Sequence, residues 1–308
     1  MEKRKIGSLE VSVVGLGCNN FGWRIDAAGT AKVVDAAIES GINFFDTADV
    51  YGGGASEEFL GRALGGRRKD VVLATKFGLP LDEQRRGGAK PAYVRQAIED
   101  SLRRLGTDRI DLYQLHRPDP ETPIADTLAT LDALVKAGKV REIGCSNFSA
   151  AQLQEAELAV KSGVARFVSV QNQYSLMHRE PEPEVLPEAQ QLRIAFIPYF
   201  PLHNGLLTGK YHAAHALPEG SRGKDSFGPK VFTKENIALA EALEKLAVSR
   251  SHTLLQLAMS WLAAQPGIAS VIAGAKTPEQ VKANAAAAGW KLSPQDLEEV
   301  DRVLLQPA

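Results

Sequence analysis

Four ionisable side chains follow three successive apolar segments in the first part of the chain. Asp46 and Tyr51 lie in FFDTADVYGGG, Lys76 ends VVLATK, and His116 ends IDLYQLH. A lysine and an aspartate at the ends of apolar strands cost free energy unless they pair, so we expect Asp46 and Lys76 to form an ion pair. A lysine beside Tyr51 would favour the phenolate, lower the tyrosine pKa and make the side chain a better acid near neutral pH. These residue types therefore indicate proton-transfer chemistry.

Each of these residues alone also has an ordinary structural explanation. Asp46 could cap a turn, Tyr51 could be a half-buried loop aromatic, Lys76 could be solvated, and His116 could be a satisfied core histidine. Four such groups at the ends of three consecutive strands are improbable by chance, so the joint pattern favours a functional site.

Short β-rich runs alternate with segments of helical period along the whole chain. The expected pairs of strand and helix are Val11–Leu16 with Gly29–Ser40, Asn43–Asp46 with Ser56–Leu64, Val71–Thr75 with Tyr93–Arg104, Ile110–His116 with Ile124–Ala137, Val140–Ser146 with Ala150–Lys161, Val168–Gln171 with Val185–Gln191, and Val271–Ala273 with Pro278–Ala287, while Ile194–Tyr199 is a further strand. About eight strands that alternate with helices pair in parallel, which favours closure into a (β/α)8 TIM barrel. An open doubly wound sheet is the alternative, but no G-x-G-x-x-G turn follows the first strand and no second domain is indicated. We therefore expect residues 1–308 to form one barrel domain.

Further segments extend this barrel at its ends. Arg4–Val13 predicts an N-terminal β-hairpin that closes the bottom, and Pro294–Leu305 predicts an extra C-terminal helix. After the seventh strand, Tyr199–Thr233 is a long loop without clear period, of a length that is usually functional or mobile. Helices are expected at Thr233–Arg250 and Thr253–Ala264. Because active sites of such barrels lie at the carboxyl ends of the strands, we expect the chemistry in the loops that follow them.

Charge and hydropathy exclude several classes of partner. The chain has 36 Lys and Arg against 37 Asp and Glu, for a net charge of -1, so nucleic acid and anionic membranes are not expected partners. Met1–Glu10 lacks the apolar region of a signal peptide, and no stretch approaches the roughly 18 apolar residues of a membrane-spanning helix. The expected compartment is the cytoplasm.

Disulfide and metal chemistry are not indicated either. Cys18 and Cys145 are too far apart for a Cys-x-x-Cys motif, and we expect two reduced, buried thiols. His203, His212 and His215 fall in the long loop with no carboxylate or cysteine pattern around them. We expect these histidines to face solvent and predict no metal site.

Along almost its whole length, the chain resembles the aldo-keto reductase family. The resemblance is carried by GINFFDTADVYGGGASEEFLGRAL, ATKFG, SLRRLGTDRIDLYQLHRPDP, GKVREIGCSNFS, VQNQYSL, IPYFPLHNGLLTGKY and VIAGAKTPEQVKAN. It implies a (β/α)8 barrel that binds an extended nicotinamide cofactor without a Rossmann motif and reduces aldehydes or ketones to alcohols, or runs the reverse. By resemblance, Tyr51 is the proton donor, Lys76 held by Asp46 lowers its pKa, and His116 orients the carbonyl.

The resemblance also places the cofactor. Ser146, Asn147 and Gln171 match the groups that hold the nicotinamide carboxamide, and Tyr199 matches the aromatic residue on which the nicotinamide ring stacks. Phe200 stands where many relatives have serine, which removes one phosphate contact. The loop Pro201–Lys210 is expected to fold over the pyrophosphate, through the backbone of Leu202 and the charge of Lys210.

The last strand–helix turn, Gly274–Asn284, resembles the site for the adenosine 2′-phosphate. Lys276 and Thr277 are expected to bind that group, together with the first amides of the following helix. Gln280 stands where many NADP-preferring relatives carry arginine. The expected cofactor is therefore NADPH, with NADH as the alternative.

Substrate contacts are less determined by the sequence. Trp23 and Phe77 are candidates for apolar pocket walls, although Trp23 could equally be packing. Arg117 follows His116 where relatives often carry tryptophan, and it could admit an acidic substrate or pair with Asp119. The expected partner is a small carbonyl or alcohol, and the expected assembly is a monomer or weak homo-oligomer.

Two other functional classes occur on barrels of this kind. A cofactor-binding regulatory subunit, resembling the potassium-channel β subunits, would share this fold, but an intact tetrad favours chemistry. A barrel isomerase or metal-dependent hydrolase would need a phosphate or metal constellation at a strand end, and the six histidines are scattered.

Overall fold

The computed structural model describes residues 1–82, 86–160, 163–213 and 228–305. Eight parallel strands form one sheet in the order β10-β3-β4-β5-β6-β7-β8-β9. Their bounds are β3 (Val14–Gly17), β4 (Phe44–Asp46), β5 (Val72–Phe77), β6 (Ile110–Leu115), β7 (Val140–Ser146), β8 (Phe167–Gln173), β9 (Ala195–Tyr199) and β10 (Val271–Gly274). The two edges of the sheet meet before β10, where Phe196 N donates to Gly267 O and Ala269 N donates to Phe196 O, both at 2.9 Å. The sheet therefore closes, and the predicted (β/α)8 barrel is confirmed.

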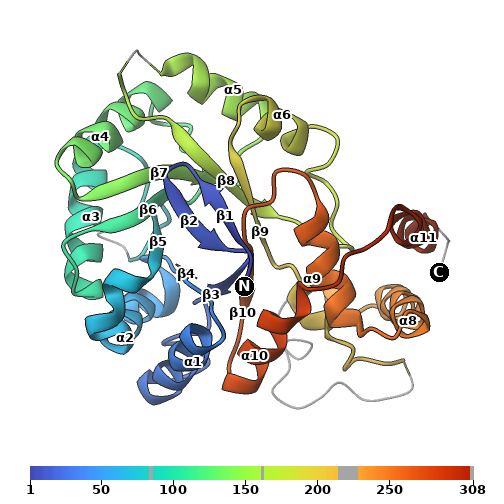
Figure 1. Ribbon diagram of the computed structural model, residues 1–308. Coiled ribbons are helices and arrows are strands. Elements are labelled where there is room, and N and C mark those ends of the chain that lie inside the picture. Colours follow the sequence, from blue (N-terminus) through green and yellow to red (C-terminus); the bar gives the residue numbers. More distant parts are fainter. Residues whose placement is uncertain (83–85, 161–162, 214–227, 306–308) are drawn as a thin grey trace.

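Helices surround the barrel (Figure 1). They are α1 (Ala27–Glu39), α2 (Ala55–Leu64), α3 (Pro91–Leu105), α4 (Ile124–Lys136), α5 (Ala150–Ala159), α6 (Val185–Gln191), α7 (Gly228–Val231), α8 (Lys234–Ser249), α9 (Leu254–Ala264), α10 (Pro278–Ala287) and α11 (Pro294–Leu305). The C-terminal helix α11 packs beside α8, outside the repeating strand–helix units. Among the described residues, no helix is long and apolar enough to cross a membrane.

An antiparallel hairpin of β1 (Lys3–Ile6) and β2 (Leu9–Ser12) lies across the end of the barrel that faces the viewer in Figure 1. Ile6 and Leu9 are fully buried in a cluster with residues at the amino ends of the strands. The expected first strand, Val11–Leu16, begins too early, because this apolar run spans the end of the hairpin and the start of β3. The chain changes direction at Val13, whose N–H donates to Glu2 O at 2.9 Å.

Two apolar layers are separated by the wall of the barrel. In β5, Val72 and Ala74 belong to the inner cluster, whereas Leu73 and Phe77 belong to the layer between the sheet and the helices. Successive side chains of a strand point to opposite faces, so Lys76 points into the barrel. The same alternation directs the last polar side chains of neighbouring strands toward one axis, and this convergence positions the site.

Candidate active site

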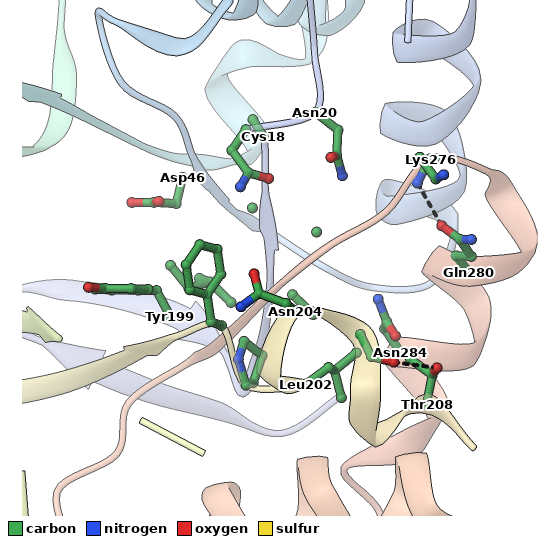
Figure 2. Close-up of a pocket in the computed structure, with 18 of the residues that line it drawn as sticks. Cys18, Asn20, Asp46, Tyr199, Leu202, Asn204, Thr208, Lys276, Gln280 and Asn284 are labelled. Atoms are coloured by element: carbon green, nitrogen blue, oxygen red, sulfur yellow. Dashed lines mark hydrogen bonds between the residues drawn. The ribbon is translucent and has the colours of Figure 1, made fainter. Parts of the chain in front are cut away.

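A cavity of about 480 Å³ opens at the carboxyl ends of the strands. The ends of β3, β4, β6, β7 and β8, the loop after β9 and the turn after β10 line this cavity. Figure 2 shows Asp46 from β4, Leu202 from the loop after β9 and Lys276 from the turn after β10 around it. The predicted site residues that line it are Asp46, Tyr51, His116, Ser146, Asn147, Gln171, Tyr199, Phe200, Leu202, Lys210, Gly274, Lys276, Gln280 and Asn284. The structure therefore brings most of the sequence-predicted residues together around one elongated space.

Asp46 and Lys76 form an ion pair beneath the cavity floor. Lys76 Nζ lies 2.6 Å from Asp46 Oδ2 and also donates to Thr47 O at 2.9 Å. Lys76 is fully buried, and burial alone would lower its pKa, but Asp46 and Tyr51 raise it further, so the net direction is upward. The lysine therefore stays charged at neutral pH.

The second oxygen of the Asp46 carboxylate is held by two amides. Gln114 Nε2 donates to Asp46 Oδ1 at 3.1 Å and Gln171 Nε2 donates to it at 2.9 Å. Sequence reasoning did not identify Gln114 as part of the site. The signal was available, because Gln114 is two residues before His116 in the strand predicted at Ile110–His116, and residues two apart in a strand point to the same face.

Tyr51 begins a tight turn that holds its side chain over Lys76. Gly52 and Gly53 follow with φ of 58° and 67°, a left-handed conformation that favours glycine. Lys76 Nζ lies 5.2 Å from the centre of the Tyr51 ring. Burial raises the pKa of Tyr51, and the charge and hydrogen bond of Lys76 act in the opposite direction without cancelling it. The expectation of a lowered Tyr51 pKa is therefore wrong for the net shift, because burial of the phenol outweighs the effect of Lys76.

His116 faces Tyr51 across the cavity. The two rings are 5.9 Å apart between centroids and nearly perpendicular. Burial, with the neighbouring charges of Lys76 and Arg117, holds the pKa of His116 well below its usual range. The imidazole is therefore neutral at pH 7, with a hydrogen bond to give from one nitrogen and one to accept at the other.

A web of hydrogen bonds joins the residues expected at the nicotinamide end. Asn147, with φ of 61°, donates from Nδ2 to His116 O at 2.9 Å and accepts from the Tyr199 hydroxyl at 2.8 Å. Ser146 Oγ donates to Gln171 O at 2.6 Å. An amide oxygen accepts two hydrogen bonds, so the Asn147 oxygen retains acceptor capacity toward a ligand.

The opposite end of the cavity is built by the turn after β10. Figure 2 shows Lys276, Gln280 and Asn284 on the far side of the cavity from Asp46. Lys276 N donates to Gln280 Oε1 at 2.8 Å, which shapes this turn. Thr277 does not line the cavity; its side chain instead accepts from Gln280 N as the N-cap of α10.

Two predicted substrate contacts lie elsewhere. Phe77 is fully buried and stacks on Tyr113 with 4.6 Å between ring centroids, because it follows Lys76 directly and so points out of the barrel. Trp23 does not line the cavity; it is 63% exposed, with the Arg24 guanidinium 4.3 Å from its ring centre. The structure thus places both outside the cavity wall.

The loop histidines also differ from expectation. His203 is half-buried, and among the described residues its buried Nδ1 has no hydrogen-bond partner. His212 is half-buried, with Nδ1 3.6 Å from a carboxylate oxygen of Glu244. The prediction that these two face solvent is wrong, because the loop folds back against the barrel and α8. His215 lies outside the described residues.

Cys18 and Cys145 are free and buried, which confirms the prediction for the thiols. Within the described part of the chain, no three histidine, cysteine or acidic side chains gather in a way that could hold a metal ion.

Several lining residues escaped sequence reasoning. Asn19 and Asn20 follow β3, and Asn20 Nδ2 donates to Ala275 O at 3.2 Å across the first and last strands. As polar residues directly after a strand, they satisfied the criterion that identified the others. Leu255 and Ala283 carried no such signal, because each belongs to a helical pattern and only the packing of α9 and α10 brings them to the cavity.

Comparison with known proteins agrees with this architecture. Residues 13–305 match the model of the aldo/keto reductase family. The chain is 37% identical to the aldo-keto reductase YhdN of Bacillus subtilis (strain 168), over 96% of this chain and 91% of that protein. It is 36% identical to the aldo-keto reductase yakc [NADP(+)] of Schizosaccharomyces pombe (strain 972 / ATCC 24843), over 96% and 89%.

Among solved structures, the glycerol dehydrogenase AKR11B4 from Gluconobacter oxydans superposes with a TM-score of 0.84 at 32% identity, covering 98% of this chain and 94% of that one. Closed barrel, site geometry and sequence matches over nearly the whole length lead to the same conclusion, that the chain belongs to the aldo-keto reductase family.

Proposed function

We propose that this chain reduces aldehyde or ketone groups to alcohols, or runs the reverse, with a nicotinamide cofactor and with Tyr51 as general acid and base. The observation that carries the proposal is the buried Lys76–Asp46 pair beneath Tyr51, with a neutral His116 across the cavity. Because Lys76 is buried, its charge acts on the phenol above it with little screening by water, and Asp46 opposes that effect only in part.

Each residue then has a role that follows from its surroundings. Tyr51 gives its proton to the carbonyl oxygen in reduction and takes it back in oxidation. The Lys76 charge stabilises the phenolate left behind, and Asp46, fixed by Gln114 and Gln171, keeps that charge in place. Neutral His116 donates a hydrogen bond to the same oxygen without competing as an acid.

The side chains that line the cavity suit a nicotinamide dinucleotide, because amides and an aromatic ring lie at one end and lysines farther along. When bound, the nicotinamide supplies or accepts the hydride. Asn147 and Gln171 would hold its carboxamide, Tyr199 would pack against its ring, and Lys210 and Lys276 would meet its phosphates. We propose NADPH in preference to NADH on the ground of Lys276, and the S. pombe relative carries NADP(+) in its name. The side-chain amide of Gln280 is neutral and therefore does not strengthen the attraction for a 2′-phosphate.

A fluorescence titration with NADPH and NADH, followed by NADPH oxidation with a panel of aldehydes, tests this proposal. We expect NADPH to bind more tightly and simple aldehydes to be reduced. Nucleotide binding without turnover of any carbonyl would favour the alternative, a cofactor-binding regulatory subunit, and failure to bind either nucleotide would overturn the proposal.

Tyr51→Phe tests the proton donor directly. It should lower kcat by about 10²-fold or more, the usual contribution of a positioned acid, while NADPH affinity stays close to that of the wild type. The matched control is Tyr113→Phe, which removes a buried hydroxyl that has no hydrogen-bond partner among the described residues and lies outside the cavity. Equal kcat in Tyr51→Phe and the control would contradict the assignment.

A further inference from the structure

Arg117 lies in the cavity wall directly after His116 and is exposed there. Within the described residues, its guanidinium makes no hydrogen bond or ion pair. Its charge nevertheless reaches the site: after burial and Lys76, it is a further cause of the low pKa of His116. It also opposes the rise that burial produces in the pKa of Tyr199. The cation therefore sits near the reacting end of the cavity.

The nearest acidic residue in the sequence is already engaged. Asp119 accepts from Ala89 N at 2.7 Å, from Thr122 Oγ1 at 2.7 Å and from Glu121 N at 2.9 Å. Although burial acts to raise the pKa of Asp119, these hydrogen bonds hold it below its usual range. The Asp119 carboxylate therefore stabilises the loop after β6. Of the two explanations for Arg117, pairing with Asp119 is excluded and an acidic substrate remains.

Among the described residues that line the cavity, no carboxylate compensates Arg117. Asp46 is the only acidic side chain among the lining residues that the structure describes, and Lys76 neutralises it at 2.6 Å. Lys276 belongs to the far end of the cavity, away from Asp46 in Figure 2. The reacting end therefore carries an uncompensated planar cation whose forked donors suit a carboxylate or a phosphate.

We propose that Arg117 is a specificity-determining residue that selects carbonyl substrates carrying an anionic group. The inference rests on the proposed reductase function and adds the substrate class to it. An aldehyde with a carboxylate or phosphate at its other end would place the reacting carbon near Tyr51 and His116 while its anion meets the guanidinium.

The test compares aldehydes with and without an anionic group at the end away from the carbonyl. The pairs are 4-carboxybenzaldehyde with 4-formylbenzamide, and D-glyceraldehyde 3-phosphate with D-glyceraldehyde, each assayed with NADPH. The measured quantity is the ratio of kcat/KM within a pair, so a general change in turnover cancels. We expect the wild type to favour the anionic member of at least one pair about tenfold or more, the usual effect of a charge-assisted hydrogen bond. The pair that shows the preference identifies carboxylate or phosphate as the anion.

Arg117→Gln should bring that ratio close to one, and Arg117→Lys should keep part of the preference. The matched control is Arg109→Gln, which removes the same charge just before β6, at the opposite end of the strand that leads to Arg117. The control should keep the wild-type ratio.

Two results would overturn the inference. They are ratios near one in the wild type and an unchanged ratio in Arg117→Gln; if that variant also loses NADPH affinity, the guanidinium binds the cofactor instead. The proposed function survives each of these as long as aldehydes are reduced. If the wild type reduces none of the four aldehydes, the proposed function fails and the inference fails with it.

Discussion

At the scale of single residues, the site depends on two side chains that are ionised although they are buried. Lys76 is fully buried and Asp46 is 2% exposed, so each depends on the other for the free energy that water would otherwise supply. The amides of Gln114 and Gln171 complete the shell around the carboxylate. A site of this kind tolerates the removal of one partner poorly, because the remaining charge has no counter-ion.

Lys76→Met should therefore lower the free energy of unfolding by about 3–5 kcal/mol, the usual cost of an uncompensated buried charge. The double variant Asp46→Asn with Lys76→Met should recover part of this loss, since a neutral amide can still accept from Gln114 and Gln171. Turnover should be low in both. Urea unfolding of the two variants beside the wild type checks this, and equal stability of single and double variants would contradict it.

A second buried acid lies between Asp46 and Tyr51 in the sequence. Asp49 is 2% exposed, and burial, followed by repulsion from Glu57, raises its pKa to about 7. Its Oδ1 is buried without a hydrogen-bond partner among the described residues. The folded protein holds the Asp49 proton more tightly than the unfolded chain does. The contribution of this group to the free energy of unfolding is therefore fully present below about pH 4 and is lost as the pH rises toward 7.

Asp49→Asn should remove this dependence. Relative to the variant, the wild type should lose stability on the order of 3 kcal/mol between about pH 4 and about pH 7, with little further change above that range. Urea unfolding of both proteins at pH 5, 6, 7 and 8 measures the difference. A constant difference across this range would show that Asp49 ionises as readily in the folded state as in the unfolded one.

At the scale of elements, α2 fixes the turn that carries Tyr51. Glu57 of α2 accepts from Thr75 of β5 at 2.5 Å and from Arg104 of α3 at 2.7 Å, and all three side chains are largely buried. Gly61 lets α2 approach α3 closely: a Cβ there would lie 2.6 Å from Leu105 C and closer still to its oxygen. Backbone atoms cannot give way as a side chain would.

Gly61→Ala should therefore destabilise the protein by about 1–3 kcal/mol, although alanine favours a helix interior by about 1 kcal/mol in the absence of contacts. Gly66→Ala is the matched control, since a Cβ there meets nothing within 4 Å. It should leave stability unchanged or slightly higher. Thermal or urea unfolding distinguishes the two, and a loss of equal size in both variants would refute the close helix contact as the cause.

At the scale of the whole molecule, stability and chemistry occupy opposite ends of the barrel. The hairpin of β1 and β2 closes the amino end, and the cavity opens at the carboxyl end. Arg4 joins the hairpin to the last part of the chain, because Nη1 donates to Ala263 O and to Ile268 O, both at 2.8 Å. This contact supports the segment through which the two edges of the sheet meet.

Arg4→Met should lower the free energy of unfolding by about 1–3 kcal/mol, since two carbonyl groups lose a charged donor. The kcat/KM for a neutral aldehyde should stay at the wild-type value. Lys5→Met is the control, because its ion pair with Glu10, at 3.6 Å, is largely exposed, and the loss of this pair should cost less than about 1 kcal/mol. A fall in kcat/KM for Arg4→Met at a temperature where it remains folded would show that the two ends are coupled.

Much of the architecture follows from local patterns in the sequence. Alternation of strand and helix sufficed for the barrel, and polar residues at strand ends sufficed to find Asp46, Lys76 and His116, which the structure brings together. The position of Phe77 could also have been predicted from the sequence. Two successive strand residues cannot both face the barrel axis, so Lys76 inside the barrel requires Phe77 outside it.

By itself, then, the sequence determined the barrel and the strand-end residues around its mouth, because period and position along a strand are properties of a few neighbouring residues. Only the tertiary structure decided which side chains meet across distant segments. Gln114 and Gln171 converge on one oxygen of Asp46, and the loop that holds Ala89 binds Asp119 and leaves Arg117 without a partner among the described residues. Such choices depend on competition among hydrogen-bond donors that approach from all sides, which no local pattern contains.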